Sequence, residues 1–142
     1  MEHEDILLLL SLPQVHWMTI SNADLRQFSF TKTQLIIMTA LYRRKTLNMT
    51  QVANFIASSK EQATRAVAQL VDKGYLTRST DPANRTYVCV SLTEQGRQVM
   101  ELCCGVFMKN LGQRLSERLT AEERESFHAS LDSLLTLLDK IC

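Results

Sequence analysis

The sequence of 142 residues has few residues that interrupt regular structure, since it contains only 4 glycines and 2 prolines. No Pro/Gly/Ser-rich linker divides it, so its length fits one compact domain or a small domain with helical extensions. The longest apolar run, residues 6–12, is much shorter than the roughly 20 residues that a membrane helix needs. The acidic residues Glu2, Glu4 and Asp5 have the wrong charge for a secretory signal. We therefore expect a cytoplasmic protein with no membrane partner.

Metal-binding and catalytic motifs are missing as well. The cysteines show no CxxC or Cys/His spacing of the kind that holds zinc, and His3, His16 and His128 lie far apart in the sequence. The sequence has no glycine-rich phosphate loop and no GxSxG or HExxH motif. We expect a protein that is not an enzyme and that carries neither a metal nor another cofactor.

Charge is nearly balanced over the whole chain, with a net value of +1, but it is unevenly distributed. Residues 31–86 contain nine Lys or Arg residues and three acidic residues, so this central segment has a net charge of +6. Residues 1–30 have a net charge of −3 and residues 87–142 a net charge of −2. A basic centre between acidic flanks indicates one module with a surface for a polyanion.

Capping residues divide the basic centre into short helices. Thr31 with Gln34 has the spacing of a capping box, Thr50 and Ser59 are N-cap candidates, and Gly74 is suited to a helix end. Between these residues the spacing of apolar positions predicts three helices. Their apolar faces contain Leu35, Met38, Leu41 and Tyr42, then Val52, Ala53, Phe55 and Ile56, and finally Ala63, Val67, Leu70 and Val71.

After Gly74 the sequence changes to the pattern of β-strands. Residues 75–78 are a strand candidate, 79–84 are rich in turn-forming residues, and 86–92 alternate in polarity. This combination predicts a β-hairpin directly after the helix pair. From Thr93 the chain is predicted to be helical again, with a break at 116–120 and a second capping box formed by Thr120 and Glu123. The last helix carries an apolar stripe made of Phe127, Leu131, Leu134, Leu135, Leu138 and Ile141.

These elements predict a mostly α-helical fold of the α+β winged-helix class. The module itself is expected at residues 31–93, with an N-terminal helix in residues 1–30 and C-terminal helices in residues 94–142. Residues 5–20 and 94–142 together contain more apolar helix surface than a module of about 60 residues could cover. We therefore predict that the two ends form a homodimer.

Two short helices joined by residues 57–59 and followed by a basic hairpin have the layout of a winged helix-turn-helix. The N-terminal residues of such a second helix reach base edges and phosphates in the major groove of double-stranded DNA. An Arg at the hairpin tip is placed to enter the minor groove. The alternative is an ordinary solvated helix surface and an ordinary turn Arg. The predicted DNA-binding residues are Ser59, Lys60, Gln62, Thr64, Arg65, Gln69, Arg78 and Arg85.

The segment from Phe30 to Gly96 resembles the MarR family of bacterial transcription regulators. The wing motif together with Lys-Gly-Tyr-Leu-x-Arg is a specific combination. The wing departs from the common Asp-Arg-Arg at Asn84-Arg85-Thr86, so the side chain before Arg85 lacks the charge that could orient it. The matching motifs are Thr31-Lys-Thr-Gln-Leu, Met49-Thr-Gln-Val-Ala, Thr64-Arg65, Lys73-Gly-Tyr-Leu-Thr-Arg78, Asp81-Pro-Ala-Asn-Arg85, Val90-Ser-Leu-Thr93 and Gly96.

The resemblance implies a homodimer with interlocked N-terminal and C-terminal helices and two winged modules that face a pseudo-palindromic operator. Regulators of this kind usually repress, and they release DNA when a small molecule or an oxidant changes the distance between the modules. A ligand achieves this only if it prefers the form that cannot bind DNA. The expected function is therefore that of a ligand-responsive repressor.

Two kinds of signal could act on such a protein. A small aromatic or lipophilic effector would suit a pocket lined by His16, Trp17, Met18 and Met38, although core packing is the more common role for each of these residues taken alone. A thiol-redox response would rely on Cys89 and Cys142, whereas Cys103 and Cys104 are predicted to be small buried hydrophobic residues. A further alternative is a winged helix that contacts a protein, which would bind DNA weakly and without a steep dependence on salt.

Overall fold

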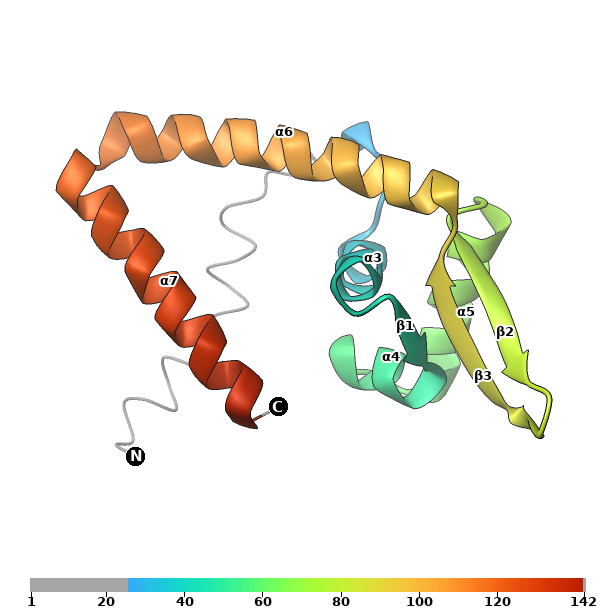
Figure 1. The fold of residues 1–142 in the computed structure, drawn as a ribbon. Coiled ribbons are helices and arrows are strands. Elements are labelled where there is room, and N and C mark those ends of the chain that lie inside the picture. The colour runs from blue at the N-terminus through green and yellow to red at the C-terminus, as the bar shows by residue number, and fades with distance from the viewer. Residues whose placement is uncertain (1–25, 142) are drawn as a thin grey trace. The chain divides into compact units, whose positions relative to one another are not determined.

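The computed structural model describes residues 26–141 (Figure 1). The chain forms two compact units, residues 1–105 and residues 106–142, and the division falls inside helix α6. We call the described part of the first unit, residues 26–105, the winged module and the second the C-terminal unit. The elements are α3 (Lys32–Arg44), β1 (Thr46–Asn48), α4 (Met49–Phe55), α5 (Lys60–Asp72), β2 (Leu76–Asp81), β3 (Asn84–Leu92), α6 (Glu94–Arg118) and α7 (Ala121–Ile141). This arrangement confirms the predicted, mostly helical winged-helix fold.

The sheet of the winged module has three antiparallel strands in the order β1-β3-β2. Leu47 of β1 lies opposite Val90 of β3, and Leu76 of β2 lies opposite Leu92. The hairpin is longer than predicted, because β2 continues to Asp81 and only two residues separate it from β3. The short strand β1 was not predicted, since three residues are too few to show a period. It forms because β3 offers a pairing edge from about 40 residues further along the chain.

The core of the winged module lies among α3, α4, α5 and the sheet. The predicted helix faces supply most of it, but Tyr42 and Phe55 were expected to be buried and are 37% and 41% exposed. The Arg44 guanidinium lies 5.5 Å from the centre of the Phe55 ring, so this ring packs beneath a cation instead of in the core. The largest fully buried side chains are Ile37, Met38, Leu41, Leu47, Val52, Val67, Leu70, Val90 and Cys103.

Capping residues begin the helices of the winged module. Thr31 and Gln34 form the predicted capping box of α3, and Ser59 caps α5. The prediction of Thr50 as the cap of α4 is wrong, because Asn48 takes that position. The Asn48 side chain accepts from the backbone N–H of Gln51, and the Gln51 side chain accepts from that of Asn48, both at 2.9 Å. This reciprocal pair satisfies two amides that the helix leaves without partners.

The junction between α5 and α6 explains why glycine occupies two positions of the sequence motifs. Gly74 ends α5 with a φ of +78°, a conformation that side chains disfavour. The Thr93 hydroxyl donates to the Gly74 carbonyl at 2.6 Å and accepts from the backbone N–H of Gly96 at 3.0 Å. A Cβ atom on Gly96 would collide with the carbonyl of Tyr75. The start of α6 therefore packs directly on the backbone that follows α5.

The C-terminal unit consists of the end of α6 and all of α7. Thr120 and Glu123 form the predicted capping box between them, with distances of 2.8 and 3.2 Å. The apolar stripe of α7 is largely exposed, since Phe127 is 40%, Leu131 42% and Leu135 47% exposed. Within residues 26–141 no helix has both the length and the apolar composition needed to cross a membrane.

Candidate nucleic-acid interface

The first half of α5 presents polar side chains on the surface opposite its buried face. Ala63, Val67 and Leu70 are fully buried, which leaves the intervening positions facing outward. The structure brings together, in an exposed group at the start of α5, the predicted DNA-binding residues Ser59, Lys60, Gln62, Thr64 and Arg65.

Hydrogen bonds within the first turns of α5 orient several of these groups. The Ser59 side chain accepts from the backbone N–H of Gln62 at 3.3 Å, and the Thr64 hydroxyl donates to the Lys60 carbonyl at 2.8 Å. Hydrogen bonds from its own backbone amide and from Ser59, aided by Lys60, hold the pKa of Glu61 below its ordinary value. A negative charge in the first turn of a helix stabilises it. The Ser59 and Thr64 hydroxyls thus already make hydrogen bonds within α5, whereas the exposed Arg65 guanidinium can donate to a bound molecule.

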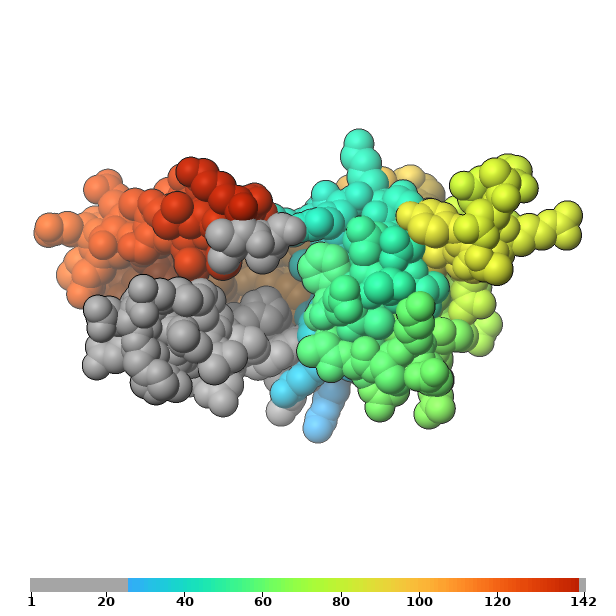
Figure 2. Space-filling model, turned by 90° about the horizontal axis from the view of Figure 1, so that it is seen from below, coloured from blue at the N-terminus to red at the C-terminus, as the bar shows by residue number. Residues whose placement is uncertain are grey.

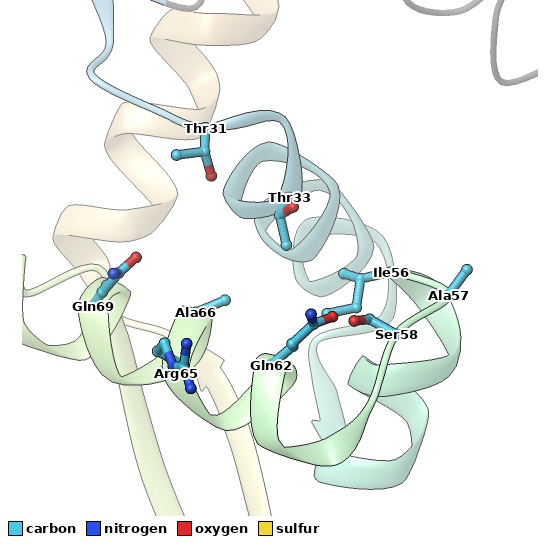
Figure 3. Close-up of a pocket in the computed structure, with 9 residues that line it drawn as sticks. All are labelled: Thr31, Thr33, Ile56, Ala57, Ser58, Gln62, Arg65, Ala66 and Gln69. Carbon is cyan, nitrogen blue, oxygen red and sulfur yellow. The ribbon is translucent and has the colours of Figure 1, made fainter.

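A hollow of about 490 Å³ lies along α5, between α5, the N-terminus of α3 and the turn after α4 (Figure 3). In Figure 3, Gln62, Arg65 and Gln69 project from one side of α5 toward this hollow. The turn before α5 has Ala57 at a φ of +49°. The residues lining the hollow are Thr31, Thr33, Ile56, Ala57, Ser58, Gln62, Arg65, Ala66 and Gln69.

The wing carries the two remaining predicted arginines. Arg78 on β2 and Arg85 on β3 are both exposed, and Arg85 lies next to the hairpin turn. The Asn84 side chain accepts from the backbone N–H and the hydroxyl of Thr86, at 3.1 and 2.6 Å. The residue that replaces the common Asp therefore shapes the turn. Figure 2 shows the wing, in yellow, projecting beside the green surface of the helices.

A smaller hollow of about 130 Å³ connects α5 with the wing, because Lys60 lines it together with Thr86, Tyr87 and Val88 of β3. The Asn48 amide donates to the Tyr87 hydroxyl at 3.3 Å, which links the cap of α4 to the wing. Sequence reasoning did not select Asn48 or Tyr87. For Asn48 a signal was present, since Asn48 and Gln51 have the same capping-box spacing as Thr31 and Gln34.

The structure describes only some of the residues that were predicted to line an effector pocket or to respond to oxidation. His16, Trp17, Met18 and Cys142 lie outside the described residues, and Met38 is fully buried in the core. The pocket and redox roles therefore stay predictions. Cys89 is half-buried in β3, opposite Asn48 and Ser79 in the neighbouring strands.

The adjacent thiols of Cys103 and Cys104 in α6 have raised pKa values, whereas a reactive cysteine has a lowered one. Burial, with a smaller effect from Cys104, raises the pKa of Cys103 to about 12. Burial and the nearby Glu101 carboxylate also raise the pKa of Cys104. Because the thiolate is the reactive form, neither group is activated at neutral pH. Among the described residues no three His, Cys, Asp or Glu side chains gather as metal ligands would.

A helix with exposed donors at its start, placed beside a basic β-hairpin, defines a winged helix-turn-helix DNA-binding domain. The model of the MarR family matches residues 30–86. The HTH-type transcriptional regulator YybA of Bacillus subtilis is 24% identical over 117 residues, which cover 80% of this chain and 75% of YybA. The HTH-type transcriptional regulator MT0903.1 of Mycobacterium tuberculosis is 30% identical over 77 residues, 54% of this chain and 53% of that protein.

Solved structures of other proteins superpose on nearly the whole of this chain. The transcriptional regulator PA4135 superposes with a TM-score of 0.75 at 28% identity and covers 96% of both chains. A mutant of MarR from E. coli in complex with operator DNA has a TM-score of 0.65 at 24% identity, with 93% of this chain and 96% of that chain covered. The protein is therefore a DNA-binding transcription regulator whose residues 30–86 are similar to the MarR family.

Proposed function

We propose that the protein binds a pseudo-palindromic operator as a homodimer and represses transcription until an effector releases it. The observation that carries the operator-binding part is the exposed group at the start of α5 beside the arginines of the wing. A helix start with Gln and Arg side chains suits base edges and phosphates in the major groove, and a projecting Arg suits the minor groove. We assign the major-groove contacts to Lys60, Gln62 and Arg65.

The homodimer is supported by the exposed apolar stripe of α7, which a second copy of the chain would cover. A two-fold dimer places two recognition helices about one helical turn of DNA apart, so the operator would contain two half-sites with that spacing. Repression and release by a small aromatic or lipophilic effector are supported by the similarity of residues 30–86 to the MarR family. The predicted pocket residues His16, Trp17, Met18 and Met38 remain part of this proposal.

The experiment is to titrate the full-length protein against the duplex upstream of its own gene and against a scrambled duplex, at several salt concentrations. We expect selective binding, and log K should fall with log salt by about 0.9 for each phosphate contacted by Lys or Arg. Arg65→Ala should weaken binding by about 1–3 kcal/mol. Arg97→Ala is the matched control, because Arg97 is an exposed arginine on α6, and it should change binding little.

The possible results separate the candidate functions. Equal binding of both duplexes by the wild type, with no loss in Arg65→Ala, would contradict sequence reading by α5. Weak binding to either duplex without a steep salt dependence would favour the alternative in which the winged helix contacts a protein.

A further inference from the structure

A chain of hydrogen bonds links the N-terminus of α3 to the exposed side of α5. Its centre is Gln34, a polar side chain that is only 3% exposed. The Oε1 atom of Gln34 accepts from the backbone N–H of Thr31 at 3.1 Å and from Nζ of Lys73 at 3.4 Å. Its Nε2 atom donates to Oε1 of Gln69 at 3.0 Å. Gln34 therefore does more than complete the capping box of α3, because its side chain also bonds to Lys73 and Gln69.

The partners of Gln34 determine which way both amides face. A backbone N–H and an ammonium group can only donate, so the Gln34 oxygen must point at them. Lys73 is itself held by the Ser29 carbonyl at 2.7 Å and lies 5.8 Å from the centre of the Phe30 ring. The Gln34 NH₂ group must then face Gln69, which turns its own oxygen inward. The NH₂ group of Gln69 is left pointing away from Gln34.

The exposed Gln69 side chain lines the same hollow along α5 as Gln62 and Arg65 (Figure 3). A glutamine that reads adenine uses both its oxygen and its nitrogen in a bidentate contact. The hydrogen bond to Gln34 turns the Gln69 oxygen toward α3, so the side of the amide that faces away from Gln34 presents a donor. A donor beside a guanidinium suits an anionic oxygen that has no hydrogen of its own, such as that of a DNA phosphate.

We propose that Gln34 is a positioning residue for DNA binding, which orients Gln69 so that its NH₂ group donates to a backbone phosphate beside α5. This inference rests on the proposed function, because it concerns how the same helix holds the operator. It assigns Gln69 to a contact with the DNA backbone. It also predicts that the buried Gln34 side chain determines whether the NH₂ group or the oxygen of Gln69 faces the DNA.

Two single variants test the proposal in the full-length protein. Gln69→Leu removes the donor and should weaken operator binding about 10-fold, as expected for one hydrogen bond to a charged acceptor. Gln34→Glu keeps the acceptors for Thr31 and Lys73 but cannot donate, so Gln69 should reverse its amide and present its oxygen to the phosphate. The loss should again be about 10-fold. Gln98→Glu, an exposed position on α6, controls for the added negative charge.

The double variant separates positioning from simple structural damage. If Gln34 acts through Gln69, then Gln34→Glu combined with Gln69→Leu should bind as Gln69→Leu does, within about 2-fold. The dependence of log K on log salt should stay unchanged in all three variants, because none of them removes a contact between a Lys or Arg side chain and a phosphate. Multiplied losses, or a smaller salt dependence caused by displacement of Lys60 and Arg65, would overturn the proposal.

A scan with duplexes that carry one neutral methylphosphonate at a time identifies the partner of Gln69. We expect one position beside α5 at which the substitution weakens the wild type but has no effect on Gln69→Leu. If Gln69→Leu instead changes the preference for a base pair and responds normally at every phosphate, Gln69 reads a base and the inference is wrong. Unimpaired binding by Gln69→Leu, with Arg65→Ala still impaired, would reject the inference and leave the proposed function intact.

Discussion

The winged module and the C-terminal unit differ in how they bury their apolar side chains. Every buried apolar side chain among residues 26–140 lies between Phe30 and Cys103, where α3, α4, α5 and the sheet enclose a common core. In α7 apolar residues also recur at helical spacing, yet Phe127, Leu131 and Leu135 are 40–47% exposed. An apolar helix face is therefore buried within the chain in the winged module and left exposed in the C-terminal unit. The module completes its core within one chain, whereas the stripe of α7 calls for a partner surface, which we propose is a second copy.

The largest expected effect would break the proposed dimer. Leu131→Glu places a carboxylate in the apolar stripe, and an unpaired charge in such an interface costs several kcal/mol, so the dimer dissociation constant should rise about 100-fold or more. Ser133→Glu, on the other side of α7, is the control with the same added charge and should leave the dimer intact. Sedimentation equilibrium measures both. An unchanged association state in Leu131→Glu would show that the stripe is not the interface.

The same truncation at two leucines should distinguish the module from the C-terminal unit. Leu70 is fully buried, and Leu70→Ala should lower the free energy of unfolding by about 2–5 kcal/mol because it leaves a cavity. Leu137 is 58% exposed, and Leu137→Ala should change it by less than about 1 kcal/mol. Urea unfolding at low protein concentration measures both without a contribution from association. Similar losses at the two positions would contradict the contrast.

Two glycines of α6 should respond with opposite signs. Gly96→Ala places a Cβ against the Tyr75 carbonyl and should destabilise the protein by about 1–3 kcal/mol. Gly112 has open space around it, and Gly112→Ala should stabilise the helix by about 0.5–1 kcal/mol through the lower flexibility of the unfolded chain. Thermal unfolding of both variants tests the pair. Destabilisation by Gly112→Ala would mean that this surface is packed in solution.

The smallest effect concerns the wing. Arg85→Ala should weaken DNA binding by roughly 1 kcal/mol, and the loss should be greatest on operators with A·T-rich outer segments, whose narrow minor groove attracts arginine. Anisotropy titrations with A·T-rich and G·C-rich flanks measure the difference. Equal losses on both flanks would remove the minor-groove role and leave Arg85 as a general phosphate contact.

Local sequence patterns predicted most of the helices. The capping boxes at Thr31 and Thr120 lie where the three-residue spacing placed them, because the atoms that bond belong to one turn of chain. The apolar positions of α5 became its buried face for the same reason. The errors have local explanations too. Asn48 and Thr50 can both cap a helix, but only Asn48 has a glutamine three residues later, Gln51, which completes a capping box.

The sequence predicted which residues form the candidate site. It did not predict how their side chains contact one another. The spacing placed Lys60, Gln62 and Arg65 on the outer side of α5, which the structure confirms. It did not reveal that Gln69 bonds to a glutamine 35 positions earlier, or that Tyr87 of the wing contacts the cap of α4. These pairs come from segments with no common period, so no pattern along the chain connects them.

The sequence by itself determined where helices begin and end, which of their faces are apolar, and that positive charge gathers in residues 31–86, because these properties depend on neighbours within a few residues. Tertiary structure alone decided the three-stranded sheet, the hollow along α5 and the direction in which the Gln69 amide points. Each of those needs groups from distant segments to meet at hydrogen-bonding distance, and that meeting is set by the packing of the core.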